Sequence, residues 1–425
     1  MAPRPVSRLL IALAVLVGIA GLVTVQTAAA AGATLYVDPK KGKDTRKGTK
    51  SGPFRSLDAA WRAARNGTTI KLAAGRIKVG PTYWEDKQGV TVVGAGMLKT
   101  SIPSANIFGI KDLTLRGVTV GGDVHCEQCD GFTLDKVRVL GRGLVQEGVK
   151  VNQSRRVTIT GSDISGATDN AIDLVAVQHA NVSGNQIHHA EDWCMYAKGG
   201  SAYVRVWDND IHDCGTGGFT AGQGTGLQFM QAPWIQYEAY DVRVWNNRIS
   251  DTAGAGLGAN GAYDALFAHN TLLRVGSRSH ALEVVFGLRS CDGQPGDEGR
   301  ERCGQLIGQG AWGTTRVDDG DNAVRIPNKH VWFYDNIVVK AAGADTFSVA
   351  DPFDGPSQDG SGVPRPALAF DDLQDVGTIV SADASASGPA HPIPAFTWDL
   401  PGVPAPADLS QAALTGLPDT AGAAR

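Results

Sequence analysis

The chain has 425 residues, among them 54 glycines, 39 basic and 43 acidic residues, and a formal net charge of −4. A slightly negative chain does not attract the phosphate backbone, so the composition argues against a nucleic-acid partner. The length alone would suggest two or more globular domains, but a repeat protein can reach it without a second core.

The N-terminal segment predicts export. Arg4 and Arg8 precede an apolar run over 9–25, and small residues follow as far as Ala31. This pattern is typical of a secretory signal peptide, so we expect residues 1–31 to be removed and the remaining chain to be secreted. An uncleaved anchor is the alternative. No later segment is long and apolar enough to span a bilayer, so we expect no membrane contact after cleavage.

Residues 32–106 predict an N-terminal cap and the first coils of a repeat. A strand begins at Thr34, a helix is expected over 56–65, and a further strand begins at Thr69. We interpret the helix as structural, because the open end of a stack of strands exposes pairing edges that a cap must cover.

The central part of the chain repeats one pattern eight times. Each segment has apolar residues at its first, third and eighth positions and a small polar residue at its sixth. The segments begin at Leu113, Phe132, Val157, Ala180, Val204, Val242, Ala265 and Val331. Several starts lie 23 or 24 residues apart, which indicates stacked repeats. Short alternating strands at this period predict an all-β chain with a right-handed parallel β-helix over 107–345.

A second strand is expected in each coil, over 149–151, 172–174, 194–196, 227–229, 257–259 and 282–284. In this register the outward residues are Lys150, Asp173, Met195, Gln228, Gly258 and Glu283. Neighbouring coils stack about 4.8 Å apart, so these residues are predicted to form one exposed strip.

One asparagine recurs at the same place in successive coils. These residues are Asn185, Asn209, Asn247, Asn270 and Asn336. We predict a buried ladder in which each side-chain amide bonds the neighbouring coil, as stacked asparagines do. They are therefore excluded from the catalytic candidates.

Six cysteines in an exported chain are compatible with disulfides. Cys291 and Cys303 are expected to close a loop, and Cys126 and Cys129 could form a short bridge. Cys194 faces inward in the expected register, where a reduced buried cysteine is also common.

Departures from the period place long loops at 212–224, 230–240 and 286–328. All are expected beside the outward strip, where loops on a rigid stack build the walls of a cleft. Residues 346–425 are rich in Pro, Ala, Ser and Asp, and we expect an irregular tail that straps along the stack.

Four residues are the catalytic candidates at the floor of this cleft. Asp169 aligns with Glu191 of the next coil, and Asp192 directly follows Glu191. Such carboxylates suit a glycosidase acid and base, a calcium site, or a solvated turn. Lys198 suits proton abstraction beside a uronate carboxylate, although a surface lysine is usually only solvated.

Aromatic and polar residues near the loops are the candidates for substrate binding. Flat rings beside a groove suit the apolar faces of sugars, or they simply pack the loops. The set is Asp173, Gln228, Trp193, Trp234, Tyr237, Arg278, His280 and Glu283.

The repeats and the cap resemble the pectate-lyase-like superfamily of right-handed β-helix proteins over residues 34 to about 345. Within it, 167–173 and 191–206 are similar to the NTD and DD motifs of polygalacturonase-like hydrolases. That resemblance assigns Asp169 and Asp192 to motif aspartates, with Glu191 where the first Asp of DD would be. GQG at 222–224 stands where GHG is expected, and no RIK follows.

Three hypotheses follow from the sequence. The first is a polysaccharide lyase or epimerase acting, as a monomer, on a uronic-acid polymer, with Ca²⁺ as a candidate cofactor. The second is a glycoside hydrolase of polygalacturonase-like type. The third is a carbohydrate-binding or surface-structural protein without catalysis. The fold alone does not choose among them, because function resides in the site.

Overall fold

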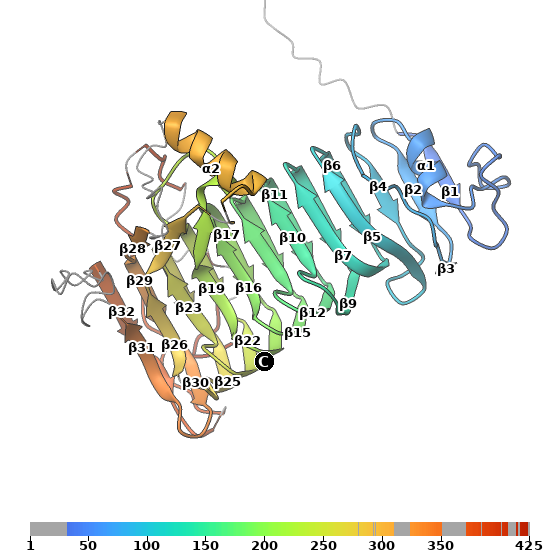
Figure 1. Ribbon diagram of the computed structural model, residues 1–425. Coiled ribbons are helices and arrows are strands. Elements are labelled where there is room, and N and C mark those ends of the chain that lie inside the picture. The colour runs from blue at the N-terminus through green and yellow to red at the C-terminus, as the bar shows by residue number, and fades with distance from the viewer. Residues whose placement is uncertain are drawn as a thin grey trace, which may run out of the picture. The chain divides into compact units, whose positions relative to one another are not determined.

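The computed structural model describes residues 32–278, 280–291, 293, 295–309, 324–350, 371–383, 385–400, 402–406, 414 and 417–423. The predicted signal peptide and Trp312 lie outside these residues. The described chain winds into a stack of parallel coils that form a 12-stranded sheet and an 18-stranded sheet (Figure 1). The 18-stranded sheet consists of two rows of strands, which are called sheets 2 and 3 below, and the 12-stranded sheet is called sheet 1. Within the described residues, no helix has the length and apolar character needed to cross a bilayer.

Sheet 1 contains the first strand of each coil and has twelve members. They are β1 (Thr34–Val37), β2 (Thr69–Leu72), β4 (Thr91–Val93), β6 (Lys111–Arg116), β8 (Asp130–Asp135), β11 (Arg155–Thr160), β14 (Gln178–Ser183), β17 (Ser201–Trp207), β21 (Ala239–Trp245), β24 (Ala262–Ala268), β29 (Lys329–Tyr334) and β32 (Asp371–Val376). The eight predicted segment starts are register partners in this sheet and point inward, which confirms the repeat.

Sheet 2 follows sheet 1 in each coil, and sheet 3 follows sheet 2. Sheet 2 contains β3 (Gly75–Arg76), the first part of β5 (Thr100–Phe108) and of β7 (Thr119–Glu127), β9 (Arg138–Val145), β12 (Asp163–Ala167), β15 (Gln186–Ala190), β18 (Asp210–Cys214), β22 (Arg248–Thr252), β25 (Thr271–Val275), β30 (Ile337–Lys340) and β33 (Ile379–Val380). Sheet 3 contains the ends of β5 and β7 with β10 (Val149–Asn152), β13 (Ile172–Val175), β16 (Trp193–Lys198), β19 (Gly217–Gly222), β23 (Leu257–Asn260), β26 (His280–Val285) and β31 (Asp345–Ala350). The stack thus continues past the expected boundary at residue 345.

The predicted cap helix is α1 (Leu57–Ala63). The Ser56 hydroxyl accepts a hydrogen bond from the Ala59 N–H, which satisfies one of the unpaired donors of the first turn. Trp61 packs on Trp84 with ring centroids 4.9 Å apart, so the helix lies against the first coils, as Figure 1 shows.

The asparagine ladder is confirmed. All five side chains are at most 2% exposed. Asn185, for example, donates from its backbone N–H to Asn209 Oδ1 at 3.0 Å, and the same contact repeats as far as Asn336. Each side-chain amide also donates to a strand carbonyl of the preceding coil, so each asparagine contacts the coils on both sides of it.

The three cysteine pairs are all disulfides: Cys126–Cys129, Cys194–Cys214 and Cys291–Cys303. Cys194 is buried, as expected, and of the two states left open for it the structure has the disulfide. Cys194 and Cys214 both point into the core from successive coils, a pairing hidden from sequence because it depends on the register of two neighbouring strands.

Two insertions leave the stack between sheet 3 and sheet 1. The first contains β20 (Gly224–Gly226) and the short 3-10 helix η1 (Leu227–Phe229). The second contains β27 (Gly287–Ser290), α2 (Glu298–Gln309) and β28 (Val324–Ile326). β27 pairs with both β20 and β28, so the two insertions form one structure.

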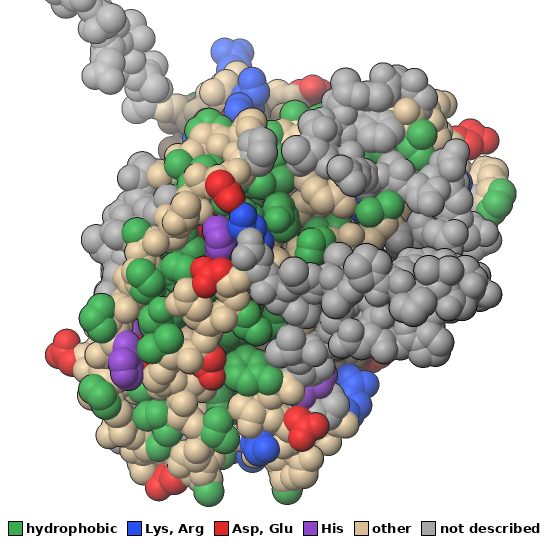
Figure 2. Space-filling view, turned by 90° about the vertical axis from the view of Figure 1, so that its left-hand side faces the viewer, with side chains coloured by type: hydrophobic (Ala, Val, Ile, Leu, Met, Phe, Trp, Pro, Cys, Tyr) green, Lys and Arg blue, Asp and Glu red, His purple; other side chains and the backbone are tan. Residues whose placement is uncertain are grey.

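The described part of the C-terminal tail lies along the outer face of sheet 1. Ile393 and Phe396 pack against Trp245 and Trp332, while Leu400 joins the aromatic cluster further along the sheet. The predicted strap is therefore present in this part. At the end of the molecule turned toward the viewer in Figure 2, the charged side chains are scattered among hydrophobic and neutral ones.

Candidate functional site

A cavity of about 190 Å³ lies on the outer face of sheet 3, where β13 and β16 end. Sheet 3 provides its floor, and Gly224, Thr225 and Phe229 of the first insertion provide one wall. The ionisable side chains that line it are Glu147, Lys150, Asp169, Asp173, Tyr196 and Lys198. The sequence placed Lys198, Asp169 and Asp173 at such a site.

Strand register determines which side chains reach the floor. Lys150, Asp173 and Tyr196 are partners in three successive coils, so they form one outward column. The prediction that Met195 faces outward is wrong, because Met195 is fully buried beside inward Ile172. A one-residue error in register exchanges the faces of a strand, so the sequence interpretation missed Tyr196.

Lys150 supplies a fixed positive charge. Its ammonium lies 2.5 Å from Glu147 Oε1 and 3.2 Å from Asp173 Oδ2. Burial opposes the charged form, but the charges of Asp173 and Glu147 and their hydrogen bonds outweigh it, so the pKa of Lys150 is raised. Asp173 is 1% exposed, and burial raises the pKa of its carboxyl. Lys150 therefore stays cationic and faces the cavity.

Tyr196 supplies a buried hydroxyl. Its oxygen accepts a hydrogen bond from Asn170 Nδ2 at 2.8 Å. Burial, reinforced by the carboxylate of Asp173, raises the pKa of Tyr196 far above its usual range. The phenol therefore keeps its proton and can donate a hydrogen bond to a ligand in the cavity.

Lys198 is the last residue of β16, and its side chain extends over the Tyr196 ring. Its Nζ lies 4.3 Å from the Tyr196 ring centroid and donates to Gln223 Oε1 at 3.0 Å. The side chain is only partly buried, so it can approach a ligand in the cavity.

A buried ion pair fixes the insertion that forms the wall. Glu238 and Arg289 are both 0% exposed and lie 2.7 Å apart. Glu238 Oε2 also accepts from the Thr225 hydroxyl at 2.6 Å and from the Gly199 N–H at 3.0 Å. Strand β16 and both insertions are thereby joined next to Lys198.

The predicted carboxylates divide into two groups. Asp169 lies at the cavity, where it accepts from Asn170 Nδ2 at 2.9 Å. Burial, and then the neighbouring Asp169 carboxylate, raise the pKa of Asp192. Glu191 is exposed and does not line the cavity, so the structure does not bring it to the site.

The residues present do not fit a calcium site. Ca²⁺ takes six to eight oxygen ligands. Asp169 and Asp192 supply only a pair of carboxylates, and Asp173 faces the Lys150 ammonium. Within the described chain, no set of three carboxylates lies close enough to share an ion. No catalytic step is therefore derived through calcium.

Several predicted substrate-binding residues do not line this cavity and pack against other side chains. Trp193 is 4% exposed, and its ring fills the space above Gly217, where a Cβ would meet the ring at 2.3 Å. Trp234 packs near Leu227 and the Cys291–Cys303 disulfide, and Tyr237 packs on Tyr263.

Gln228 lies in η1, away from the expected strand. The third-sheet strand of its coil is β19, so the predicted strand over 227–229 is wrong. The glycine-rich run 215–218 was interpreted as part of a loop because Gly is depleted in strands. Here the absent side chain leaves room for the Trp193 ring.

A second polar group lies further along sheet 3. Glu283 is three register partners from Tyr196, which corresponds to about 14 Å at the usual spacing. His280 Nε2 lies 2.9 Å from Glu283 Oε2, and Asn260 Nδ2 donates to Glu283 Oε1 at 2.9 Å. Arg278 is exposed and donates to the Gly215 carbonyl at 2.6 Å. These residues extend the polar floor beyond the cavity.

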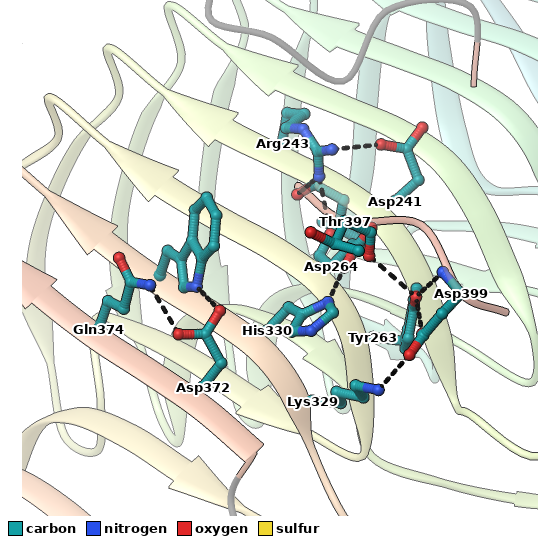
Figure 3. Close-up of polar contacts among 12 residues, drawn as sticks. Asp241, Arg243, Tyr263, Asp264, Lys329, His330, Asp372, Gln374, Thr397 and Asp399 are labelled. Atoms are coloured by element: carbon teal, nitrogen blue, oxygen red, sulfur yellow. Dashed lines mark hydrogen bonds and ion pairs between the residues drawn. The ribbon is translucent and has the colours of Figure 1, made fainter. Parts of the chain in front are cut away.

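The outer face of sheet 1 contains another charged network, shown in Figure 3. His330 Nδ1 lies 2.6 Å from Asp264 Oδ1, and Arg243 lies 2.8 Å from Asp241. The Phe396 ring from the tail lies 4.3 Å from the Arg243 guanidinium carbon. Because the tail covers this network, it is an attachment for the strap and is not open to a polymer.

Residues 122–276 match the family model described as a right handed beta helix region. The chain contains a right-handed β-helix. The predicted right-handed parallel β-helix is thereby confirmed. No curated protein sequence gives a significant match.

Solved structures that are similar to this chain include the following three. Pectate lyase Pel9A is 12% identical, with a TM-score of 0.39, over 76% of this chain and 78% of its own. The A-module of the Azotobacter vinelandii mannuronan C-5 epimerase AlgE4 is 13% identical, with a TM-score of 0.39, over 81% and 97%. The GH136 lacto-N-biosidase from Eubacterium ramulus is 10% identical, with a TM-score of 0.43, over 82% and 67%.

Proposed function

We propose that this protein is a secreted lyase or epimerase that acts on a uronic-acid-containing polysaccharide at the sheet 3 cavity. The observation that carries the proposal is the convergence of Lys198, Tyr196 and Lys150 on one cavity. A cation, a protonated phenol and an amine are the groups that proton abstraction beside a carboxylate requires.

Each residue has a defined role in this mechanism. The Lys150 ammonium pairs with the uronate carboxylate, which stabilises the negative charge that develops when the C5 proton leaves. Lys198 is the general base that accepts that proton. In elimination, the C5–H electron pair forms the C4=C5 double bond, the C4–O4 bond breaks, and the Tyr196 hydroxyl protonates the leaving oxygen. In epimerisation, Tyr196 instead returns a proton to the opposite face of C5.

Export is part of the proposal. Three disulfides within the described chain suit an oxidising compartment, where polysaccharides of this kind also occur. The charged, apolar and small-residue succession of the first 31 residues supports the same inference.

The carboxylates favour this mechanism over glycoside hydrolysis. The two carboxyl groups of a glycosidase lie about 5–9.5 Å apart, on either side of the scissile bond. Asp169 lies at the cavity but Asp192 does not line it, so this pair does not stand on either side of a sugar bound there.

The test is an incubation of the full chain with polygalacturonate, alginate and a neutral polysaccharide, each with and without chelator. A lyase produces new ultraviolet absorbance from unsaturated ends, and an epimerase incorporates deuterium from heavy water at C5. Lys198→Ala should lose this activity while retaining the wild-type melting temperature. Tyr196→Phe should also lose it, with a lowered melting temperature because Asn170 Nδ2 loses a buried acceptor. Lys71→Ala, an exposed lysine on β2, is the matched control.

Reducing ends without ultraviolet absorbance would overturn the proposal in favour of a hydrolase. Binding of a polymer without any turnover would overturn it in favour of a carbohydrate-binding protein. Full activity of Lys198→Ala would refute the assigned site.

A further inference from the structure

Three histidines meet on the outer face of sheet 2, away from the sheet 3 cavity. His188 and His212 are register partners on the neighbouring strands β15 and β18. Their rings are stacked, with centroids 4.7 Å apart and an interplanar angle of 6°. His189 follows directly on β15, and its φ of 55° turns the backbone into the left-handed region, so its ring joins its neighbour on the same face.

The ring nitrogens of these residues face one another. His188 Nδ1 and His189 Nδ1 are 2.6 Å apart. One nitrogen from each of the three rings lies within 4.8 Å of the other two. Two imidazole nitrogens in such contact cannot both present lone pairs unless a proton or a cation lies between them.

Carboxylates occupy the opposite side of two of the rings. His188 Nε2 lies 3.1 Å from Asp163 Oδ1, and His212 Nδ1 lies 2.7 Å from Asp213 Oδ2. A carboxylate on one ring nitrogen fixes the tautomer and directs the lone pair of the other nitrogen away from it. Here that leaves His188 Nδ1, which faces His189, and His212 Nε2 free of a carboxylate partner. This pattern of carboxylate, histidine and metal recurs in metalloproteins.

We propose that His188, His189 and His212 form a binding site for one divalent transition-metal ion of the Zn²⁺ or Cu²⁺ class. Three imidazoles favour these ions over Mg²⁺ and Ca²⁺, which prefer oxygen ligands. Three protein ligands leave a coordination position for water. The ion bridges β15 and β18, so its binding links two successive coils. This inference does not depend on the proposed polysaccharide activity.

The test uses the full chain without a histidine tag, stripped with a chelator, desalted, and titrated with Zn²⁺ at neutral pH by calorimetry. We expect one ion per chain and a melting temperature that rises with Zn²⁺. His212→Ala and His189→Gln should each weaken Zn²⁺ binding at least about 10-fold. Co²⁺ should give a visible absorption spectrum that these variants lose.

Two further variants make the test specific. Asp163→Asn removes a carboxylate behind the rings without removing a ligand, and it should weaken Zn²⁺ binding about 10-fold. His179→Ala is the matched control, because His179 is an exposed histidine on sheet 1 that stacks on Tyr203, and its affinity should equal that of wild type.

Circular dichroism of each variant separates loss of the site from loss of folding. Absence of Zn²⁺ binding by wild type, or unchanged binding in folded His212→Ala and His189→Gln, would overturn the proposal.

Discussion

Replacing Asn247 with alanine tests whether the ladder stabilises the stack. Its Oδ1 accepts from the Asn209 backbone N–H at 3.0 Å and from Asn209 Nδ2 at 2.9 Å. Its Nδ2 donates to the carbonyls of Val206 at 3.0 Å and Trp245 at 2.9 Å, and to Asn270 Oδ1 at 3.0 Å. The side chain is 0% exposed, so water cannot replace these contacts without opening the stack.

The expected cost follows from the groups that lose a partner. The Asn209 N–H loses its acceptor, and the Val206 carbonyl loses a donor. A buried group without a partner costs about 1–3 kcal/mol, so Asn247→Ala should lower the free energy of unfolding by about 2–4 kcal/mol.

Urea denaturation of wild type and variant, followed by circular dichroism, measures this difference. Asn181→Ala is the matched control, because Asn181 is an exposed asparagine on β14, and it should change stability by less than about 0.5 kcal/mol. Equal midpoints for Asn247→Ala and Asn181→Ala would refute the reasoning.

Three other predictions follow. Lys198→Ala should reduce turnover about 10²–10⁴-fold on a uronate polymer while its melting curve stays that of wild type; an unchanged rate would exclude it as the base. Glu238→Ala should destabilise by about 3–5 kcal/mol, because Arg289 is left as an uncompensated buried charge; an unchanged melting temperature would contradict this. Burial opposes the protonation of His330, but the hydrogen bond and charge of Asp264 outweigh it and raise its pKa. The folded state then binds this proton more tightly than the unfolded state does. Wild type should therefore be more stable than His330→Gln below about pH 6.5, and this difference should disappear as the pH rises through the raised pKa. Melting temperatures of wild type and variant that change in parallel with pH would argue against it.

The repeat could be predicted from sequence because its signals are local and periodic. Each inward residue of sheet 1 recurs with the coil, and the ladder asparagine follows it at a fixed distance, as for Val204 and Asn209. The cap helix was also predictable, since Ser56 precedes an apolar run in the way that helix N-caps do.

The site was harder to predict because it depends on the exact register of sheet 3. Four successive residues of β16, from Cys194 to Ala197, are buried, so alternation does not show which of them faces outward. Tyr196 was missed for this reason. The same register between coils determines that Cys194 pairs with Cys214 and that His188 lies beside His212. A single sequence specifies this register only where a strong pattern such as the asparagine ladder is present.

The ladder also bears on how such a chain can change in length. Each rung needs only the rung before it and the rung after it, so duplicating one coil of about 23 residues would add a unit that satisfies its neighbours immediately. The outward side chains take no part in these contacts and can diverge afterwards. A gene could therefore lengthen or shorten the outer face of sheet 3 in steps of about 4.8 Å while the cavity at Lys198 keeps its geometry.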